Sequence, residues 1–206
     1  MEKMKFTELQ KDALKEIGSI CAGNAATALS QLFNKKIEME VPEIFFLPIE
    51  EVPKTVGGED KLVVGLVIRI LGDFPSIILL IFSQEDAKSL ASLMIGKEYP
   101  RGGQVISDVE RSALKEIGVI LANAYLGALA VFVKWGLVPR VPELIEDMAG
   151  AMVDYILIEL SSVSQYALLI KSEFKEATTR VVGNFFLIPN PDGLKLLLKA
   201  IDYQTK

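Results

Sequence analysis

The sequence predicts an α+β fold of two related halves, in which two long helices pack on an antiparallel β-sheet and a shorter helix ends each half. Three observations support this prediction: a repeat at a constant offset of 100 residues, a long amphipathic helical pattern in each half, and alternating apolar runs bounded by turn residues. An internal repeat constrains the architecture more than any other sequence feature. Here it predicts one domain with halves of about 6–100 and 106–206, related by a pseudo-twofold axis.

The repeat consists of two identical stretches in one register. Residues 14–18 (Leu-Lys-Glu-Ile-Gly) recur as residues 114–118, and residues 41–43 (Val-Pro-Glu) recur as residues 141–143. A five-residue identity alone is compatible with chance. A second identity without any slippage makes duplication the better interpretation.

Each half begins with the pattern of a long helix, predicted over 8–34 and 108–135. Thr7 and Ser107 each begin a capping box, in which the hydroxyl accepts from a backbone N–H and a Gln or Glu side chain reaches back to the cap. Apolar residues then step by three or four positions, which is the spacing of one buried stripe. The stripe of the first helix is Leu14, Ile17, Cys21, Ala25, Ala28 and Leu32, and the equivalent positions of the second helix are also apolar.

The faces opposite these stripes carry the candidate functional residues. A Glu on a surface helix is usually just a solvated side chain, so the functional interpretation depends on the repeat. A second signal is the glycine inside each helix, Gly18 and Gly118, because each costs about 1 kcal/mol relative to Ala and therefore indicates close packing or contact. The opposite faces carry Asp12, Glu16, Ser19 and Gly23 in the first helix, and Ser112, Glu116, Val119 and Asn123 in the second.

The remainder of each half is predicted to form strands and a shorter helix. Pro42 and Pro142 are expected to fix the turn between each long helix and the strand that follows. Ser83 and Asp192 are the predicted caps of the two shorter helices, and Gly96 is expected to end the first of them. We predict a strand over 36–40 that Pro42 interrupts and an extended segment over 44–47 that resumes it. Further strands are predicted over 62–71, 76–82, 151–160, 166–171 and 180–188, with an extended segment over 144–148, a loop over 50–61, a connector over 97–104, and helices over 84–94 and 193–201.

Composition excludes several classes of function. The formal net charge is −5 and the sequence pI is about 5.0, which argues against a nucleic-acid partner. The chain has one Cys and no His, so an intrachain disulfide, a cysteine-rich zinc site and a histidine base are impossible. A hydrolase built from this chain must use carboxylates, amides, hydroxyls or groups of a partner.

The apolar segments do not indicate a membrane protein. The N-terminal residues 1–5 lack the apolar region of a secretory signal. The longest apolar region, 62–82, is interrupted by Arg69, Asp73 and Pro75 and is unsuited to span a bilayer. We therefore expect a cytoplasmic protein without membrane insertion. No glycine-rich phosphate loop and no cluster of metal ligands is evident in the sequence, so we expect no cofactor of its own.

The first half resembles a known family. The spacing Asp12-x-x-x-Glu16-x-x-Ser19, then 22 residues, then Pro42 is similar to the signature of the CheC / CheX / FliY phosphatases of bacterial and archaeal chemotaxis. The segment Gly-Asn-Ala-Ala-Thr-Ala at 23–28 is particularly similar to CheC. The resemblance covers nearly the whole chain.

The second half repeats this signature with the same spacing. Ser112, Glu116 and Val119 are followed by 22 residues and then Pro142. Two copies in a chain of this length suit CheC better than CheX. The family pattern has Asn where Ser19 and Val119 stand, so the sequence departs from it at the position that the family uses to orient a water.

The resemblance implies a protein that binds phosphorylated CheY and promotes hydrolysis of its aspartyl phosphate. Glu16 and Glu116 would each pair with a lysine of the regulator, Ser19 would hold the water, and any Mg²⁺ would be supplied by the bound regulator. The receptor deamidase CheD is a second implied partner. The main alternative is a non-catalytic binding module for phospho-CheY or CheD, and a third is a structural component related to the flagellar switch.

Overall fold

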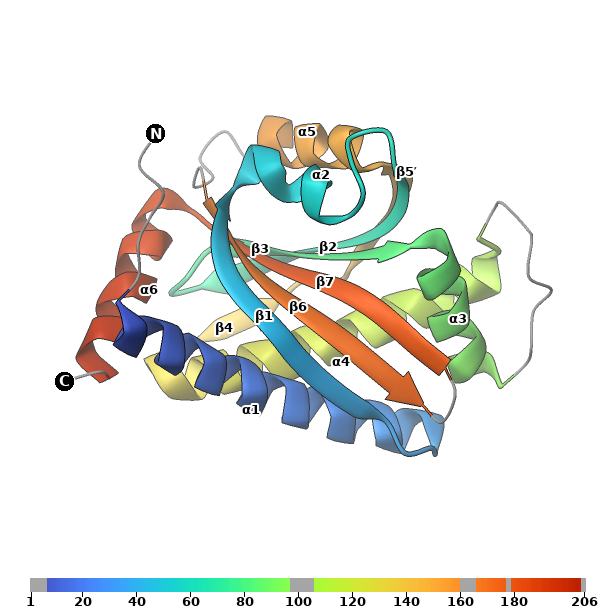
Figure 1. Ribbon diagram of the computed structural model, residues 1–206, viewed down its shortest axis with the longest axis horizontal. Helices are drawn as coiled ribbons and strands as arrows, with labels where there is room; N and C mark the ends of the chain where they lie inside the picture. The colour runs from blue at the N-terminus through green and yellow to red at the C-terminus, as the bar shows by residue number, and fades with distance from the viewer. Residues whose placement is uncertain (1–6, 97–105, 160–165, 177–178, 205–206) are drawn as a thin grey trace.

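The computed structural model is an α+β structure in which helices cover both faces of one antiparallel sheet (Figure 1). The long helices α1 (Glu8–Phe33) and α4 (Asp108–Val133) cover one face. The short helix α2 (Val52–Thr55) and α5 (Ala149–Glu159) cover the other. The structure describes residues 7–96, 106–159, 166–176 and 179–204.

Among the described residues the sheet has seven strands, and the pairings between them are all antiparallel. Its order is β1-β6-β7-β3-β2-β4. Strand β5 pairs with the first part of β2, along the same edge on which β4 pairs with its last part. Each strand has a counterpart in the other half: β1 corresponds to β4 and β5, β2 to β6, and β3 to β7. Exchanging the counterparts gives the same strand order read in reverse, as a duplication would. The strands are β1 (Glu38–Pro48), β2 (Leu62–Gly72), β3 (Ser76–Ser83), β4 (Leu137–Pro139), β5 (Glu143–Met148), β6 (Tyr166–Glu176) and β7 (Thr179–Pro189).

Local capping sets the ends of the helices. Both predicted capping boxes are present, since the Gln10 backbone N–H donates to Thr7 Oγ1 at 3.2 Å and the Ser107 N–H donates to Glu110 Oε2 at 2.7 Å. A shorter helix follows the last β-hairpin of each half, as predicted. These are α3 (Gln84–Ile95), whose Ser83 cap and Gly96 end are confirmed, and α6 (Pro191–Gln204).

The sheet face under α1 and α4 carries the larger apolar core. Leu14, Ile17 and Cys21 are buried there as predicted, whereas Leu32 is 37% exposed. Leu29 and Phe33 are buried toward the end of α1 instead, because the apolar stripe of a straight helix with 3.6 residues per turn drifts around its axis.

Helix α4 is long and apolar enough to cross a membrane by length and composition alone. Its apolar side is used in the core: Leu114, Ile117 and Leu121 are fully buried against α1 and the sheet. These residues make α4 the central helix of a packed domain.

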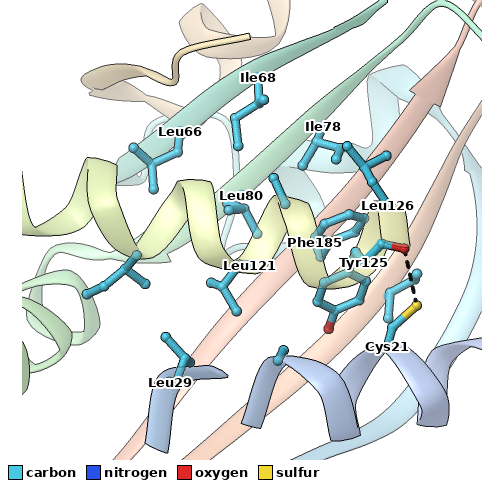
Figure 2. Packing of buried hydrophobic residues seen from close by; sticks show 14 of the residues in the cluster. Cys21, Leu29, Leu66, Ile68, Ile78, Leu80, Leu121, Tyr125, Leu126 and Phe185 are labelled. Atoms are coloured by element: carbon cyan, nitrogen blue, oxygen red, sulfur yellow. Dashed lines mark hydrogen bonds between the residues drawn. The ribbon is translucent and has the colours of Figure 1, made fainter. Parts of the chain in front are cut away.

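The two long helices run antiparallel and contact each other near their middles (Figure 1). The Cys21 thiol donates to the Tyr125 carbonyl at a sulfur–oxygen distance of 3.6 Å, as Figure 2 shows. The Tyr125 ring stacks on Phe185 of β7 with centroids 4.1 Å apart, and its hydroxyl lies 2.6 Å from Ser172 Oγ of β6. Tyr125 therefore ties both helices to the centre of the sheet.

The glycines inside the long helices allow them to approach the strands closely, as predicted. Both Gly18 and Gly118 are buried. A Cβ at Gly18 would collide with the Ile44 side chain of β1, and a Cβ at Gly118 would lie 2.9 Å from Leu66 Cδ1 of β2. By contrast, no atom lies within 4 Å of a Cβ placed at the exposed Gly23.

This contrast gives a matched pair of variants. Gly118→Ala and Gly23→Ala both gain the same helix propensity of about 1 kcal/mol, but only Gly118→Ala must displace a buried leucine. We expect Gly118→Ala to be less stable than Gly23→Ala by about 1–3 kcal/mol, measured as the difference in free energy of unfolding in urea. Equal stability of the two variants would contradict the tight contact between α4 and β2.

Three predicted elements are wrong. Residues 151–160 were expected to form a strand, but the described part, 151–159, belongs to α5, because Met152, Val153 and Ile156 are buried at helical spacing. The expected loop at 50–61 contains α2 and part of a 3₁₀ helix (Ile49–Glu51). Helix α6 begins at Pro191, and Asn190 rather than Asp192 accepts from the Gly193 N–H, at 2.6 Å. The predicted connector at 97–104 lies outside the described residues.

Candidate functional site

The predicted site residues lie on the outward faces of α1 and α4, as the helical periodicity predicted. On α1 and α4 the two glutamates at equivalent positions are both exposed, while Val119 is half-buried. The predicted outward placement therefore holds for seven of these residues, and Val119 is only partly outward. The exposed members are Asp12, Glu16, Ser19, Gly23, Ser112, Glu116 and Asn123.

The glutamates are free carboxylates. Glu16 and Glu116 form no hydrogen bond or ion pair with any residue that the structure describes. Their outward orientation leaves both oxygens of each carboxylate available for a cation of a partner. A lysine ammonium offers three donors that such a carboxylate can accept.

Ser19 lies one turn after Glu16 on α1, and its hydroxyl is partly used by the helix. Ser19 Oγ donates to the Lys15 carbonyl at 2.9 Å. The proton of the hydroxyl is thereby committed, while its oxygen lone pairs remain able to accept a hydrogen bond from water. Ser19 can therefore hold a water through one contact, whereas Val119 at the equivalent position has no polar group to do so.

The two signature prolines occupy equivalent irregularities in the outer strands, rather than the turns that the sequence suggested. Between Glu40 and Glu43, three steps along β1 oppose two along β6, and Pro42 falls inside this bulge. Between Pro139 and Glu143, four steps oppose three along β2, and Pro142 falls inside that one. A bulge in an outer strand suits proline because no ladder N–H is lost.

Pro142 connects this bulge to the helix above it. Its side chain is buried, and its Cγ lies 3.7 Å from the Cβ position of Gly118. The signature proline thus supports α4 directly beneath the turn that presents Glu116 and Val119. The spacing between Glu116 and Pro142 has a structural basis in this contact between the chain beside β5 and α4.

A hydrogen-bonded cluster beside the α4 face was not predicted. Glu143 accepts from Arg69 Nη1 of β2 at 2.8 Å and from the Tyr155 hydroxyl of α5 at 3.1 Å. The hydrogen bond from Arg69 holds the pKa of the Glu143 carboxyl below its usual range. The Tyr155 hydroxyl and the charge of Lys115 lower this pKa by smaller amounts. Glu143 is therefore already paired, whereas Glu116 pairs with no residue in the described part of the chain. The sequence showed Glu143 only as part of a repeated triplet.

Asn123 and the lone cysteine have different surroundings. Asn123 is exposed, and its amide makes no hydrogen bond with any described residue.

Cys21 is 2% exposed, and burial raises the pKa of its thiol to about 12. It borders a small apolar cavity of about 30 Å³ between α1, α4 and the sheet. A buried thiol with so high a pKa is not a nucleophile.

Cys21 should therefore be unreactive in the folded protein. At pH 8 we expect a chromogenic disulfide reagent to release almost no thiolate from the native chain, because the thiol is both inaccessible and protonated. The same reagent should count one thiol per chain after unfolding in guanidinium, which serves as the control. Rapid reaction of the native protein would show that α1 separates from α4.

Comparisons with known proteins agree with this geometry. A sequence model of the CheC-like family matches residues 9–45. The chain is 34% identical to the CheY-P phosphatase CheC of Bacillus subtilis over 197 residues, which is 94% of each protein. FliY of Thermotoga maritima has the same fold, with a TM-score of 0.76 at 17% identity over 97% of this chain and 99% of that one. A chain of the CheX-CheY-BeF3-Mg²⁺ complex of Borrelia burgdorferi matches with a TM-score of 0.50 at 15% identity, over 84% of this chain and 96% of that one.

Proposed function

Because this chain belongs to the CheC-like family, we propose that it binds the phosphorylated response regulator CheY and promotes hydrolysis of its aspartyl phosphate. The observation that carries the proposal is the outward face of α1. There Glu16 presents a free carboxylate, and Ser19 presents an oxygen that can accept from water one turn further on. The CheY-P phosphatase CheC of Bacillus subtilis aligns with 94% of this chain, which supports the same reaction here.

The face acts by positioning. Glu16 pairs with a lysine of the regulator and fixes the phosphoaspartate against α1, while Ser19 Oγ accepts a hydrogen bond from the attacking water. The water attacks phosphorus, the bond between phosphorus and the aspartyl oxygen breaks, and inorganic phosphate and the free carboxylate result. Phosphoryl transfer requires mainly such positioning together with electrostatic stabilisation. Mg²⁺ held by the regulator supplies the charge stabilisation, so this chain needs no cofactor of its own.

The loss of Asn at both motif positions favours a second candidate, a binding module that regulates by occupancy. In that case the protein engages phospho-CheY, or the receptor deamidase CheD, without accelerating hydrolysis. The α4 face fits this description better than the α1 face, because Val119 can orient no water. Both functions place the protein in the cytoplasm, where its regulator is phosphorylated.

Charge reversal tests the docking. We expect the double variant Glu16→Lys with Glu116→Lys to weaken binding of BeF3-activated CheY by about 10-fold or more, because a lysine of the regulator then faces like charge. Each single variant should weaken binding by less, since one face remains intact. Isothermal titration calorimetry measures all three affinities. If the double variant binds as tightly as wild type, neither face is the docking site.

Substitution of the water-holding position tests the chemistry. Ser19→Ala should slow dephosphorylation of CheY, and Ser19→Asn should accelerate it by up to about 10²-fold, because a longer planar amide holds the water better in line. Val119→Asn should create activity on the α4 face. Loss of radiolabelled phosphate from CheY over time gives the rates, with Asp60→Lys on a distant loop as a control. If wild type is fast and neither Asn substitution changes its rate, Ser19 does not hold the water.

A further inference from the structure

The two outward faces repeat their docking features but not their catalytic one. Each carries a glutamate at the same position that pairs with no described residue. Ile20 on α1 is 51% exposed, while the identical residue Ile120 on α4 is partly buried against the core. The first turns match as well, since Leu9 is 63% exposed and Val109 is 56% exposed. Exposed apolar side chains around a free charge are the composition of a protein-docking surface.

The water-holding position is polar on the α1 face and apolar on the α4 face. Ser19 offers an acceptor oxygen, while Val119 is apolar and half-buried. A regulator docked on α4 through Glu116 therefore meets an apolar side chain at the position of Ser19. The exposed amide of Asn123 lies one turn further on, about 6 Å along the helix, and is out of place for a water held in line. The regulator's phosphoaspartate would be bound there without being hydrolysed by this chain.

The distance between the two faces follows from the helix pair. The helices run antiparallel and meet at Cys21 and Tyr125. Glu16 precedes Cys21 by five residues and Glu116 precedes Tyr125 by nine, so at about 1.5 Å per residue the glutamates lie about 21 Å apart along the axes. An interaxial distance of about 8–10 Å raises their separation to about 23 Å.

That separation is smaller than the width of the proposed partner. A single domain of about 100 residues has a radius of gyration of about 13 Å and is thus roughly 33 Å across. Both glutamates project from the same side of the molecule, away from the sheet. Two such domains seated on points about 23 Å apart on one side of a surface would overlap.

We propose that the α1 and α4 faces compete for a single molecule of phosphorylated regulator, and that the α4 face holds it non-productively. This inference rests on the proposed phosphatase function. The α4 face then acts as a built-in competitive brake on the α1 face. Non-productive binding lowers kcat and KM by the same factor, because a fraction of the bound substrate always occupies the wrong site. Equal affinity of the faces makes this factor about two.

Stoichiometry tests the competition. Calorimetric titration of the full chain with BeF3-activated CheY in Mg²⁺ should give one regulator per chain, and the mass of the complex in sedimentation should agree. Two regulators per chain would overturn the competition and leave the phosphatase function standing. No binding at all would contradict the proposed function and with it this inference.

Steady-state kinetics test the non-productive face. We expect Glu116→Lys to raise kcat and KM together, by about two-fold when the faces have equal affinity, while Asp60→Lys on a distant exposed loop changes neither. Val119→Asn should raise kcat at unchanged one-to-one stoichiometry, because the second face becomes productive. A fall in kcat for Glu116→Lys would show that the α4 face is catalytic, and no change in either constant would show that it does not compete. Absence of turnover by wild type would instead contradict the phosphatase function. The measured number of regulators bound per chain would then still show whether the two faces compete.

Discussion

The contact between α1 and α4, where the Cys21 thiol donates to the Tyr125 carbonyl, fixes the positions of all the candidate residues. Buried glycines let each helix lie close on its strands, so the helices have little freedom to rotate about their axes. The Tyr125 ring stacked on Phe185 then fixes the pair to the centre of the sheet. A rotation of either helix would bury a glutamate that must face a partner, which is why the core and the site depend on the same contacts.

The two halves offer equivalent positions on their long helices that differ in chemistry. Both halves retain the outward glutamate, the internal glycine and a proline in the bulge of an outer strand. The glycine and the proline lie where helix and strand meet, and the glutamate is the residue that we propose docks a partner. The water-holding position differs between the halves, and nothing in the fold requires it to be polar, since both Ser19 and Val119 are accommodated on the same helical face. The fold can thus keep a docking surface while its catalytic capacity changes.

Sequence reasoning succeeded where the signal was local and periodic. The capping boxes, the buried stripe through Leu14 and Ile17, and the outward face through Glu16 all follow from helical spacing. It failed at 151–160, where a run of apolar residues suits a strand or a buried helix equally well. The packing of this segment on β2, where Met152 fills the space left by Gly65, selects the helix. The pairing of Glu143 with Arg69 was also out of reach, because those residues lie 74 positions apart.

The sequence by itself determined the two halves, the faces of the long helices and the residues on them, because duplication and a period of 3.6 are properties of the chain alone. Only the tertiary structure decided how those faces relate. The antiparallel crossing at Cys21 and Tyr125 places both glutamates on one side of the molecule, on opposite sides of the crossing point. Periodicity within a helix carries no information about its orientation toward a helix a hundred residues away, and that orientation is set by side-chain packing across the shared core.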